Sequence, residues 1–320
     1  MTVARLLLLN KLLKMKRIVL FLTLLVFFHT PLNAGATEAP TFDIKNGVNP
    51  VQLNQSGKFL SAPSGISTTP AGDYLLVADP GNNEIKVLDT GKLKQLSQFG
   101  KGDLADPHDV AFDPKGRLLV ADTKNDRIMI YKFDGVYRDG SPNIEYLATI
   151  SDGLSAPKGV AAGTGGRIYI ANTGDNSVLL IKDGKIITRI TAAGPAETAL
   201  SGPIDVHIDS AGHVLVSDSG NKRVLVFDFS LKFQQELSTE KYGFKRPGRI
   251  SSDDAGLIFI ADEGRDEIGI IDSRFKPKGR INASSTRPGG LIRPQGIETI
   301  GRYMWVTDTG NNRVILYKRE

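Results

Sequence analysis

Six short runs of apolar residues recur along the chain, and each run ends at an aspartate or an asparagine. They read LLVAD at 75–79 and 118–122, IYIAN at 168–172, VLVSD at 214–218, IFIAD at 258–262 and MWVTD at 304–308. Because nearly every position is apolar, we expect strands that are covered on both faces. A turn containing glycine precedes each run, and a turn of the Gly-Asn-Asn type leads into another apolar strand, such as 128–131 or 224–227.

A proline lies 14 to 16 residues before the end of each apolar run, and these prolines define the period of the chain. They are Pro63, Pro107, Pro157, Pro203, Pro247 and Pro294, spaced by 44, 50, 46, 44 and 47 residues. A period in the middle forties with strand-like content is typical of β-propellers, in which each repeat is one four-stranded blade. The sequence therefore predicts an all-β fold, a six-bladed β-propeller over residues 50–320.

The first 36 residues differ from the repeats. They combine an apolar run at 18–28 and small residues at 34–36 with the basic residues Arg5, Lys11, Lys14, Lys16 and Arg17. This order is typical of a secretory signal peptide, so we expect residues 1–36 to be removed and residues 37–49 to form a linker. The alternative is an uncleaved membrane anchor, but the apolar run is shorter than the roughly 20 residues that a spanning helix needs.

Setting the leader aside changes the charge of the protein. The five leader charges are all positive, so the net charge of +5 becomes zero in the mature chain. No excess of positive charge remains that would favour binding to nucleic acid. The chain has no cysteine, which in an exported protein is more typical of a bacterial periplasmic or secreted protein than of an animal extracellular one. We expect a monomer that is stabilised by its core alone.

The residue that ends each apolar run has the same place in all six repeats: Asp79, Asp122, Asn172, Asp218, Asp262 and Asp308. Such side chains accept hydrogen bonds from nearby backbone N–H groups, so we expect them to stabilise the turn that follows. In three repeats an arginine follows the turn, namely Arg127, Arg223 and Arg313, and we expect it either to pair with a nearby aspartate or to lie over an adjacent blade. A metal-binding ring of carboxylates is the alternative. A residue that recurs in nearly all blades is better explained by a structural role that every blade needs.

These motifs resemble the NHL repeat, in which a P-x-G-[IV] segment precedes [LIV]-[YFLW]-[VI]-[AST]-D-[TS]-G-N-[NK]-R-[IV]. The copies at 203–227 and 294–317 are most similar to it, whereas the third copy departs at Asn172 and Ser177 and the fifth at Arg265 and Glu267. The resemblance covers residues 57–320 and implies a propeller, a scaffold that hosts unrelated activities. Propellers of the YWTD and gluconolactonase types are less similar.

The two ends of the repeat region indicate how the ring closes. The last repeat lacks an outer strand, because the chain ends three residues after Tyr317. The segment QLNQSGK at 52–58 matches QLSQFGK at 95–101, which is the outer strand before the second proline. We therefore expect residues 50–56 to complete the last blade and to leave no open sheet edge.

The residues that break the repeat are the best candidates for a specific function. The pattern places a glycine two residues after each proline, but Asp109, Asp205 and Arg249 stand there in three blades. One mouth of the central channel would then carry mixed charged groups, which suits a small polar ligand or a loop of a partner. The alternative is that Asp109 and Arg249 neutralise each other across a water-filled channel. The candidate ligand-binding residues are His108, Asp109, Lys158, Asp205, Arg249 and Gln295.

Groups that could catalyse a reaction are sparse. The mature chain has no cysteine and three histidines, His108, His207 and His213. A relative in the resembled family, the peptide-amidating lyase, uses three histidines on this scaffold for zinc, and only His108 is similarly placed. A lactonase-type calcium site would draw on Asp109 and Asp205. We expect no cofactor and keep a metal-dependent lyase or lactonase, with zinc or calcium in the channel, as the alternative.

We therefore expect an exported binding or interaction module rather than an enzyme. Its partner would be a protein or a small polar ligand, and a membrane would be contacted only through an uncleaved signal segment. The loops that differ most in length are candidate contact surfaces, because long connections on a rigid ring commonly carry recognition. They lie at 134–156, with Tyr137 and Tyr146, at 192–202 and at 273–291. The alternative is that these loops are tolerated insertions.

Deleting residues 37–56 should strongly destabilise the domain, because the last blade would lose its outer strand and expose a sheet edge. Thermal unfolding followed by circular dichroism measures the effect. Deletion of the linker 37–49 alone is the control, since it leaves the strand in place. An unchanged melting temperature in the longer deletion would contradict this mode of closure.

Overall fold

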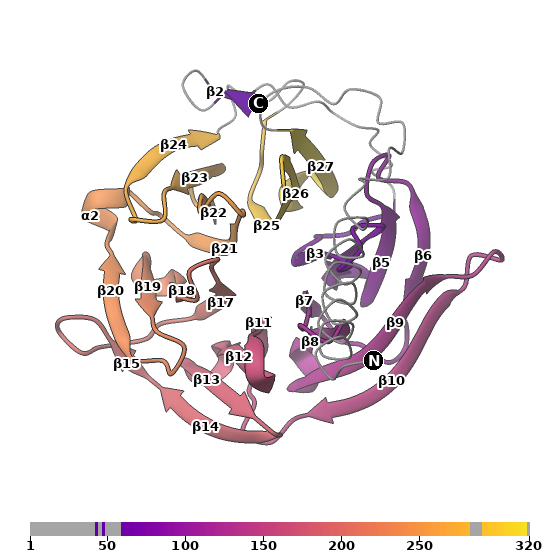
Figure 1. Ribbon diagram of the computed structural model, residues 1–320, viewed down its shortest axis with the longest axis horizontal. Coiled ribbons are helices and arrows are strands. Elements are labelled where there is room, and N and C mark those ends of the chain that lie inside the picture. The colour runs from indigo at the N-terminus through magenta and orange to yellow at the C-terminus, as the bar shows by residue number, and fades with distance from the viewer. Residues whose placement is uncertain (1–41, 44–46, 49–58, 282–289, 319–320) are drawn as a thin grey trace, which may run out of the picture. The chain divides into compact units, whose positions relative to one another are not determined.

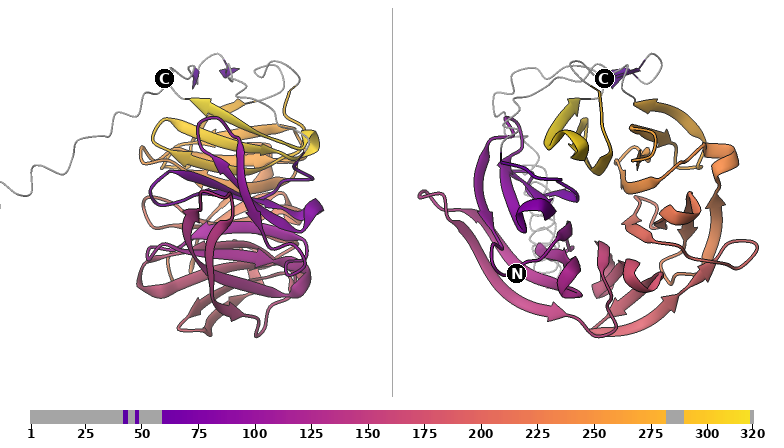
Figure 2. Two further views of the ribbon diagram at one scale, coloured as in Figure 1. Left: turned by 90° about the vertical axis from the view of Figure 1, so that its right-hand side faces the viewer. Right: turned by 180° about the vertical axis from the view of Figure 1, so that it is seen from behind.

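The computed structural model describes residues 42–43, 47–48, 59–281 and 290–318. Within this part of the chain, six antiparallel sheets surround a central axis (Figure 1). Seen from behind, the same sheets follow one another around the axis in chain order (Figure 2). The expectation of an all-β, six-bladed propeller is confirmed. The described residues contain no helix of the length and apolar character that crossing a membrane would require.

Each blade starts with its inner strand and runs outward. The first three sheets are β3 (Ile66–Thr68), β4 (Tyr74–Asp79), β5 (Glu84–Asp89) and β6 (Gln95–Phe99); β7 (Pro107–Phe112), β8 (Arg117–Asp122), β9 (Arg127–Val136) and β10 (Pro142–Ile150); and β11 (Pro157–Ala162), β12 (Arg167–Asn172), β13 (Ser177–Lys182) and β14 (Lys185–Ile190). Strands β7, β11 and β17 begin at the repeated prolines, so each of these prolines marks the start of an inner strand.

The remaining sheets follow the same order. They are β17 (Pro203–Ile208), β18 (Val214–Asp218), β19 (Arg223–Phe227) and β20 (Phe233–Leu237); β21 (Pro247–Ser252), β22 (Ile258–Asp262), β23 (Glu267–Ile271) and β24 (Pro277–Ile281); and β25 (Pro294–Ile300), β26 (Tyr303–Asp308) and β27 (Arg313–Lys318). Short elements outside the blades are β1 (Phe42–Asp43) paired with β2 (Gly47–Val48), β15 (Ala192–Ala193) paired with β16 (Thr198–Ala199), and α2 (Thr239–Tyr242).

The apolar second strands are buried because each sheet packs against a neighbour on both faces. Along β4, Leu76 packs in a cluster with Leu118 of the second blade, whereas Leu75 and Val77 pack in a cluster with Trp305 of the sixth. All three leucine and valine side chains of β4 are fully buried. Successive residues of a strand point to opposite faces, so a strand between two blades is apolar at every position.

Direct contact between the sixth and first blades closes the ring. Trp305 Nε1 donates a hydrogen bond to the carbonyl oxygen of Thr90 at 2.9 Å. Thr307 Oγ1 donates to the carbonyl oxygen of Ser64 at 2.7 Å, and Thr309 Oγ1 to that of Pro63 at 2.6 Å. The sixth sheet has three strands among the described residues. The segment 50–56, expected as its fourth strand, lies outside them, as do residues 1–36 and most of the linker 37–49.

The repeated aspartates are buried and join two parts of their own blade. Asp218 Oδ1 accepts the backbone N–H of Ser201 at 2.7 Å, and Oδ2 accepts the side chains of Asn221 at 2.8 Å and Arg223 at 2.7 Å. Asp122 and Asp308 bind the same kinds of partner, including Arg127 and Arg313. Asn172 Oδ1 accepts the N–H of Ser155, Asp79 Oδ1 that of Ser61, and Asp262 those of Lys245 and Arg246.

The backbone donors therefore differ from those expected from the sequence. We expected N–H groups of the turn after the aspartate, but in every blade a donor lies just before the proline of the same blade. Only Asp262 also accepts an N–H of the following turn among the described residues, from Gly264 at 3.2 Å. The sequence pattern could not show these donors, because the two segments lie 16 to 18 residues apart and meet only after the sheet has formed.

A second set of side chains links neighbouring blades. The last residue of the turn, directly before the third strand, adopts a left-handed conformation. In several blades its side chain reaches the loop before the next inner strand. Asp126 Oδ1 accepts the N–H of Ala156 at 2.6 Å, and Asn176 Oδ1 that of Gly202 at 2.6 Å. Asn312 Oδ1 accepts the N–H of Ala62 at 2.7 Å, which joins the last blade to the first. The Asn-Asn turn thus serves both to reverse the chain and to connect blades.

Replacing Asp218 with alanine should destabilise the propeller by about 3 kcal/mol, because the buried Arg223 would keep only Glu236 as a carboxylate partner and the Ser201 N–H would lose its acceptor. Asp218→Asn is the matched control: the amide oxygen can still accept the Ser201 N–H, as Asn172 does in the third blade, so it should cost less. Chemical denaturation measures both free energies of unfolding. Equal stability of wild type and Asp218→Ala would contradict this role.

Candidate functional site

Arg249 of the fifth blade lies in the channel and binds residues of the second, third and fourth blades. Its Nη1 lies 3.0 Å from Asp109 Oδ2 and 2.9 Å from Asp205 Oδ1. Its Nη2 donates to the carbonyl oxygens of His108 and, at 2.9 Å, Lys158. These partners stand on β7, β11 and β17, whereas Arg249 stands on β21. All three charged side chains are buried, so one guanidinium serves two carboxylates within the channel.

The two carboxylates also receive backbone hydrogen bonds across blade boundaries. Asp109 Oδ2 accepts the N–H of Val160 at 2.9 Å, and Asp205 Oδ2 that of Ile250 at 2.8 Å. Burial raises the pKa of Asp109, while the Arg249 guanidinium lowers it and Asp205 raises it. The alternative that Asp109 and Arg249 neutralise each other fits this geometry, except that they are in direct contact rather than separated by water.

The other predicted residues lie on one side of this cluster. His108, Lys158 and Gln295 line a chamber of about 170 Å³ at the starts of the inner strands. We call it the mouth chamber. The residues that complete its lining are Ser64, Ile204, Arg246, Arg249, Glu263 and Arg293. Arg246 and Arg293 directly precede repeated prolines and Glu263 follows a repeated aspartate, so a search of positions flanking the motif would have found them.

The mouth chamber carries more positive than negative charge. Arg246 Nε lies 3.7 Å from Glu263 Oε2, and this is the one ion pair of the chamber apart from those of Arg249 and His108 among the described residues. Lys158 Nζ and the guanidinium of Arg293 have no hydrogen-bond or ion-pair partner in that part of the chain. Burial lowers the pKa of Lys158, and the nearby Arg249 lowers it further. Burial raises the pKa of Glu263, and Arg246 opposes that effect.

His108 bridges two side chains at the wall of the chamber. Its Nδ1 lies 3.4 Å from Ser64 Oγ, and its Nε2 lies 3.6 Å from Asp106 Oδ2. Burial lowers the pKa of His108; the Asp106 carboxylate raises it, and Lys158 lowers it again. The net direction is downward, so the imidazole is neutral near pH 7.

His108, His207 and His213, the histidines among the described residues, do not converge. His207 Nε2 lies 2.9 Å from Ser252 Oγ, and His213 Nδ1 lies 2.8 Å from Asp209 Oδ2. The described residues contain no group of three or more histidine, aspartate or glutamate side chains that could hold a metal ion. The donor set therefore does not fit a zinc tripod or an all-oxygen calcium site.

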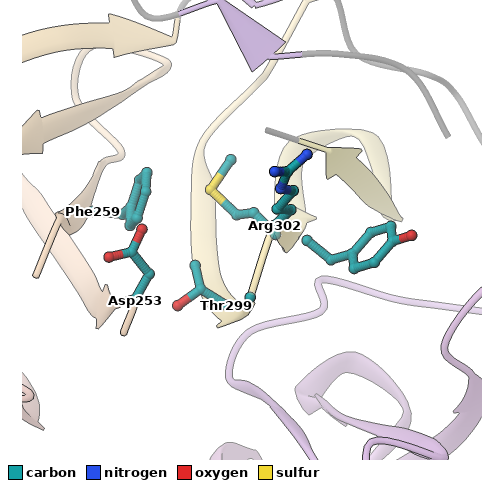
Figure 3. Close-up of a pocket in the computed structure, with 7 residues that line it drawn as sticks. Asp253, Phe259, Thr299 and Arg302 are labelled. Carbon is teal, nitrogen blue, oxygen red and sulfur yellow. The ribbon is translucent and has the colours of Figure 1, made fainter. Parts of the chain in front are cut away.

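A second chamber of about 250 Å³ is lined by residues further along the inner strands. Arg249, Asp109 and Asp205 line it too, together with His207 and Glu298. Glu298 Oε1 accepts the N–H and hydroxyl of Thr68 at 3.0 and 2.7 Å, and burial raises its pKa to about 7. A recess between the fifth and sixth blades, lined by Asp253, Phe259, Thr299 and Arg302 (Figure 3), has a volume of about 10 Å³, enough for one water.

The long hairpin of the second blade extends beyond the ring (Figure 1). It comprises β9 and β10, so much of the segment 134–156, predicted as a loop, is strand. Tyr137 and Tyr146 are 55% and 57% exposed. The loop 192–202 contains β15 and β16. The loop 273–291 is described only up to 281 and from 290.

Comparisons with known structures place the chain among β-propellers. A streptogramin B lyase structure shares 18% identity, with 84% of this chain and 87% of that chain covered and a TM-score of 0.56. A catalytically inactive virginiamycin B lyase from Staphylococcus aureus with quinupristin shares 17%, with coverage of 84% and 87% and a TM-score of 0.57. A luciferin-regenerating enzyme shares 16%, with coverage of 84% and 94% and a TM-score of 0.59. At these identities the likeness shows the fold alone. No curated protein matches the sequence.

One family model matches residues 33–272, three quarters of the chain, and is described as a lactonase, 7-bladed beta-propeller. That description names seven blades, whereas the described residues of this chain build six. The similarity to the NHL repeat remains a resemblance between sequence motifs. The match ends just after the third strand of the fifth blade, and so covers most of the ring. The chain thus belongs to the lactonase family of β-propellers.

Proposed function

We propose that this protein is an exported propeller that binds a small anionic ligand, such as a carboxylate, in the mouth chamber. One observation carries the proposal: the half-buried Lys158 and the exposed Arg293 line the same chamber, and neither cation forms an ion pair with a described residue. A half-buried ammonium without a partner is costly, and an anionic ligand would offset that cost at Lys158 through a charge-assisted hydrogen bond. The chamber of about 170 Å³ suits a ligand of a few heavy atoms.

The ion pairs of Arg249 with Asp109 and Asp205 support this proposal, because they hold one side of the chamber's lining in a fixed position. Asp109 and Asp205 both pair with Arg249, and neither forms an ion pair with Lys158 or Arg293. The backbone N–H groups that hold the two aspartates belong to other blades, which fixes the wall in place. A preformed polar site loses little conformational entropy on binding.

A protein partner at the rim of the second blade is the second candidate. Tyr137, Tyr146 and Leu147 are exposed on the protruding hairpin, and exposed aromatic residues are frequent in protein interfaces. A metal-dependent lyase or lactonase is less well supported, because the described residues supply no set of metal ligands. Export rests on the basic, apolar and small residues of the leader and on the absence of cysteine.

Binding should be detected by isothermal titration of the mature protein with succinate, citrate or inorganic phosphate, and it should weaken with added salt. Lys158→Met and Arg293→Met should each weaken binding by about tenfold or more, as expected for one charge-assisted hydrogen bond. Lys182→Met, on the exposed end of β13, is the control and should bind like wild type. Absence of binding to every probe would contradict the proposal.

Binding should also weaken as the pH rises, because Lys158 has a lowered pKa and loses its charge before an ordinary lysine would. Lys158→Arg should bind the same probe and keep its affinity at alkaline pH, since a guanidinium stays protonated. Titrations at neutral and alkaline pH measure the difference between the two proteins. If wild type and Lys158→Arg lost affinity equally, Lys158 would not be the group that holds the anion.

Replacing Arg249 with methionine should destabilise the propeller by about 3–5 kcal/mol at neutral pH, because Asp109 and Asp205 would remain as buried carboxylates without their cation. The triple variant Arg249→Met, Asp109→Asn, Asp205→Asn removes all three charges and should recover much of that loss. Denaturant unfolding measures both. A single variant as stable as wild type would show that the cluster does not hold the channel.

A further inference from the structure

Each of the six inner strands presents one equivalent residue to the second chamber, at the position four residues after the repeated proline. All six of these residues line the chamber, and we call them the fourth-position ring: Ser67, Ala111, Ala161, His207, Ser251 and Glu298. None of them lines the mouth chamber. Every blade has this position, so the fold does not require it to differ from blade to blade. The differences within the ring therefore determine which ligand the second chamber accepts.

The fourth, fifth and sixth blades form a polar wall of the chamber. Each of their ring residues contacts the residue after the ring position in the next blade: His207 Nε2 and Ser252 Oγ at 2.9 Å, Ser251 Oγ and Thr299 Oγ1 at 3.1 Å, and Glu298 Oε1 and Thr68 Oγ1 at 2.7 Å. Glu298 is the charged residue of this wall and is partly exposed. Its Oε1 also accepts the N–H of Thr68, whereas its Oε2 has no hydrogen-bond partner among the described residues. One carboxylate oxygen is therefore left for a ligand.

The second and third blades form an apolar wall of the same chamber. They place Ala111 and Ala161 in the ring, and Phe112 and Ala162, the next residues of the same strands, also line the chamber. The sheets follow one another around the axis in chain order, so the third blade stands opposite the sixth (Figure 1). Ala161 therefore belongs to the wall across the chamber from Glu298. A ligand in the chamber meets a carboxylate on one side and methyl groups on the other.

The charge of the second chamber is opposite to that of the mouth chamber. Asp109, Asp205 and Glu298 line the second chamber, and none of these carboxylates lines the mouth chamber. Arg249 is the one lysine or arginine that lines the second chamber among the described residues, and it already pairs with both aspartates. His207 adds no positive charge near pH 7, because burial lowers its pKa and Asp205 opposes that effect only in part. Glu298 is therefore the carboxylate without a cation.

We infer that the second chamber binds a small primary amine, with its ammonium group on Glu298 Oε2 and a short alkyl chain against Ala111 and Ala161. An ammonium group donates hydrogen bonds and supplies the cation that Glu298 lacks. The apolar wall favours an organic cation, and the described residues contain no set of ligands for a metal ion. A chamber of about 250 Å³ is smaller than the site of a drug-sized ligand, so the alkyl chain is short. This inference does not rest on the proposed function, because Arg249 is the only residue that lines both chambers among those described.

Isothermal titration of the mature protein with n-butylamine and with 1-butanol tests the charge of the ligand. The amine should bind about tenfold more tightly or better, because only its ammonium group makes a charge-assisted hydrogen bond with Glu298. Glu298→Gln should lose about tenfold or more in affinity for the amine. It should keep the melting temperature of wild type, since the amide oxygen can still accept both hydrogen bonds of Thr68. Glu145→Gln, an exposed glutamate of β10, is the matched control and should bind like wild type. Equal affinity for amine and alcohol, or unchanged binding in Glu298→Gln, would overturn the inference.

Amine binding should strengthen as the pH rises through about 7 and then level off. Burial raises the pKa of Glu298 to about 7, so the carboxylate that holds the ammonium group is ionised only above that pH. The titratable and charged groups that share the chamber with Glu298 are His207, Asp109, Asp205 and Arg249. Burial also raises the pKa of Asp109, so Glu298→Gln separates the two carboxylates. If that variant kept the full pH dependence, Asp109 would be the titrating group and the inference would be wrong.

A series from methylamine to n-butylamine tests the apolar wall. Each added methylene group should tighten binding about threefold, because it is removed from water. Ala161→Ser should reduce this gain for n-butylamine and leave methylamine unaffected. Lys158→Met should not change amine binding, and Glu298→Gln should not change succinate binding, so the two sites are tested separately. Equal affinities along the series, or no binding of any amine, would overturn the inference.

Discussion

Each blade of this protein has two apolar faces, and only a neighbouring blade on each side removes both from water. Leu76 packs toward the second blade and Leu75 toward the sixth, although they are adjacent in sequence. Burial of this kind contributes about 25 cal/mol per Å² of apolar surface. No blade can bury both faces alone, so the ring must close, and the contacts of Trp305 and Thr307 with the first blade are part of the same requirement.

Ring closure brings the inner strands together, and polar groups there must find partners across blades. Arg249 binds Asp109, Asp205 and the carbonyl oxygens of two further residues, which joins the second to the fifth blade. Buried charges are tolerated when they are paired and hydrogen-bonded, as these are. The same cluster separates the channel into two chambers, so an architectural interaction also shapes the candidate site.

Several side chains of the mouth chamber take no part in the ion pairs of Arg249 with Asp109 and Asp205. Lys158 and Arg293 remain without ionic partners among the described residues, and His108 remains neutral between Ser64 and Asp106. Membership of the lactonase family and likeness in fold to lyase structures are compatible with catalysis but do not define it, because one propeller scaffold hosts many activities. The residues of the chamber, rather than the fold, decide what this protein binds.

The sequence by itself determined the number of blades, the inner strands and the positions that deviate from the repeat, because strand burial and turn chemistry leave a local, periodic pattern. Arg249, Asp109 and Asp205 could be named as exceptions for that reason. Only the tertiary structure decided that they bind one another, that the repeated aspartates hold the loops before the prolines, and that Arg293 and Ser64 share a chamber. Contacts around the ring join residues up to 250 positions apart, and no local pattern records which distant side chains will meet.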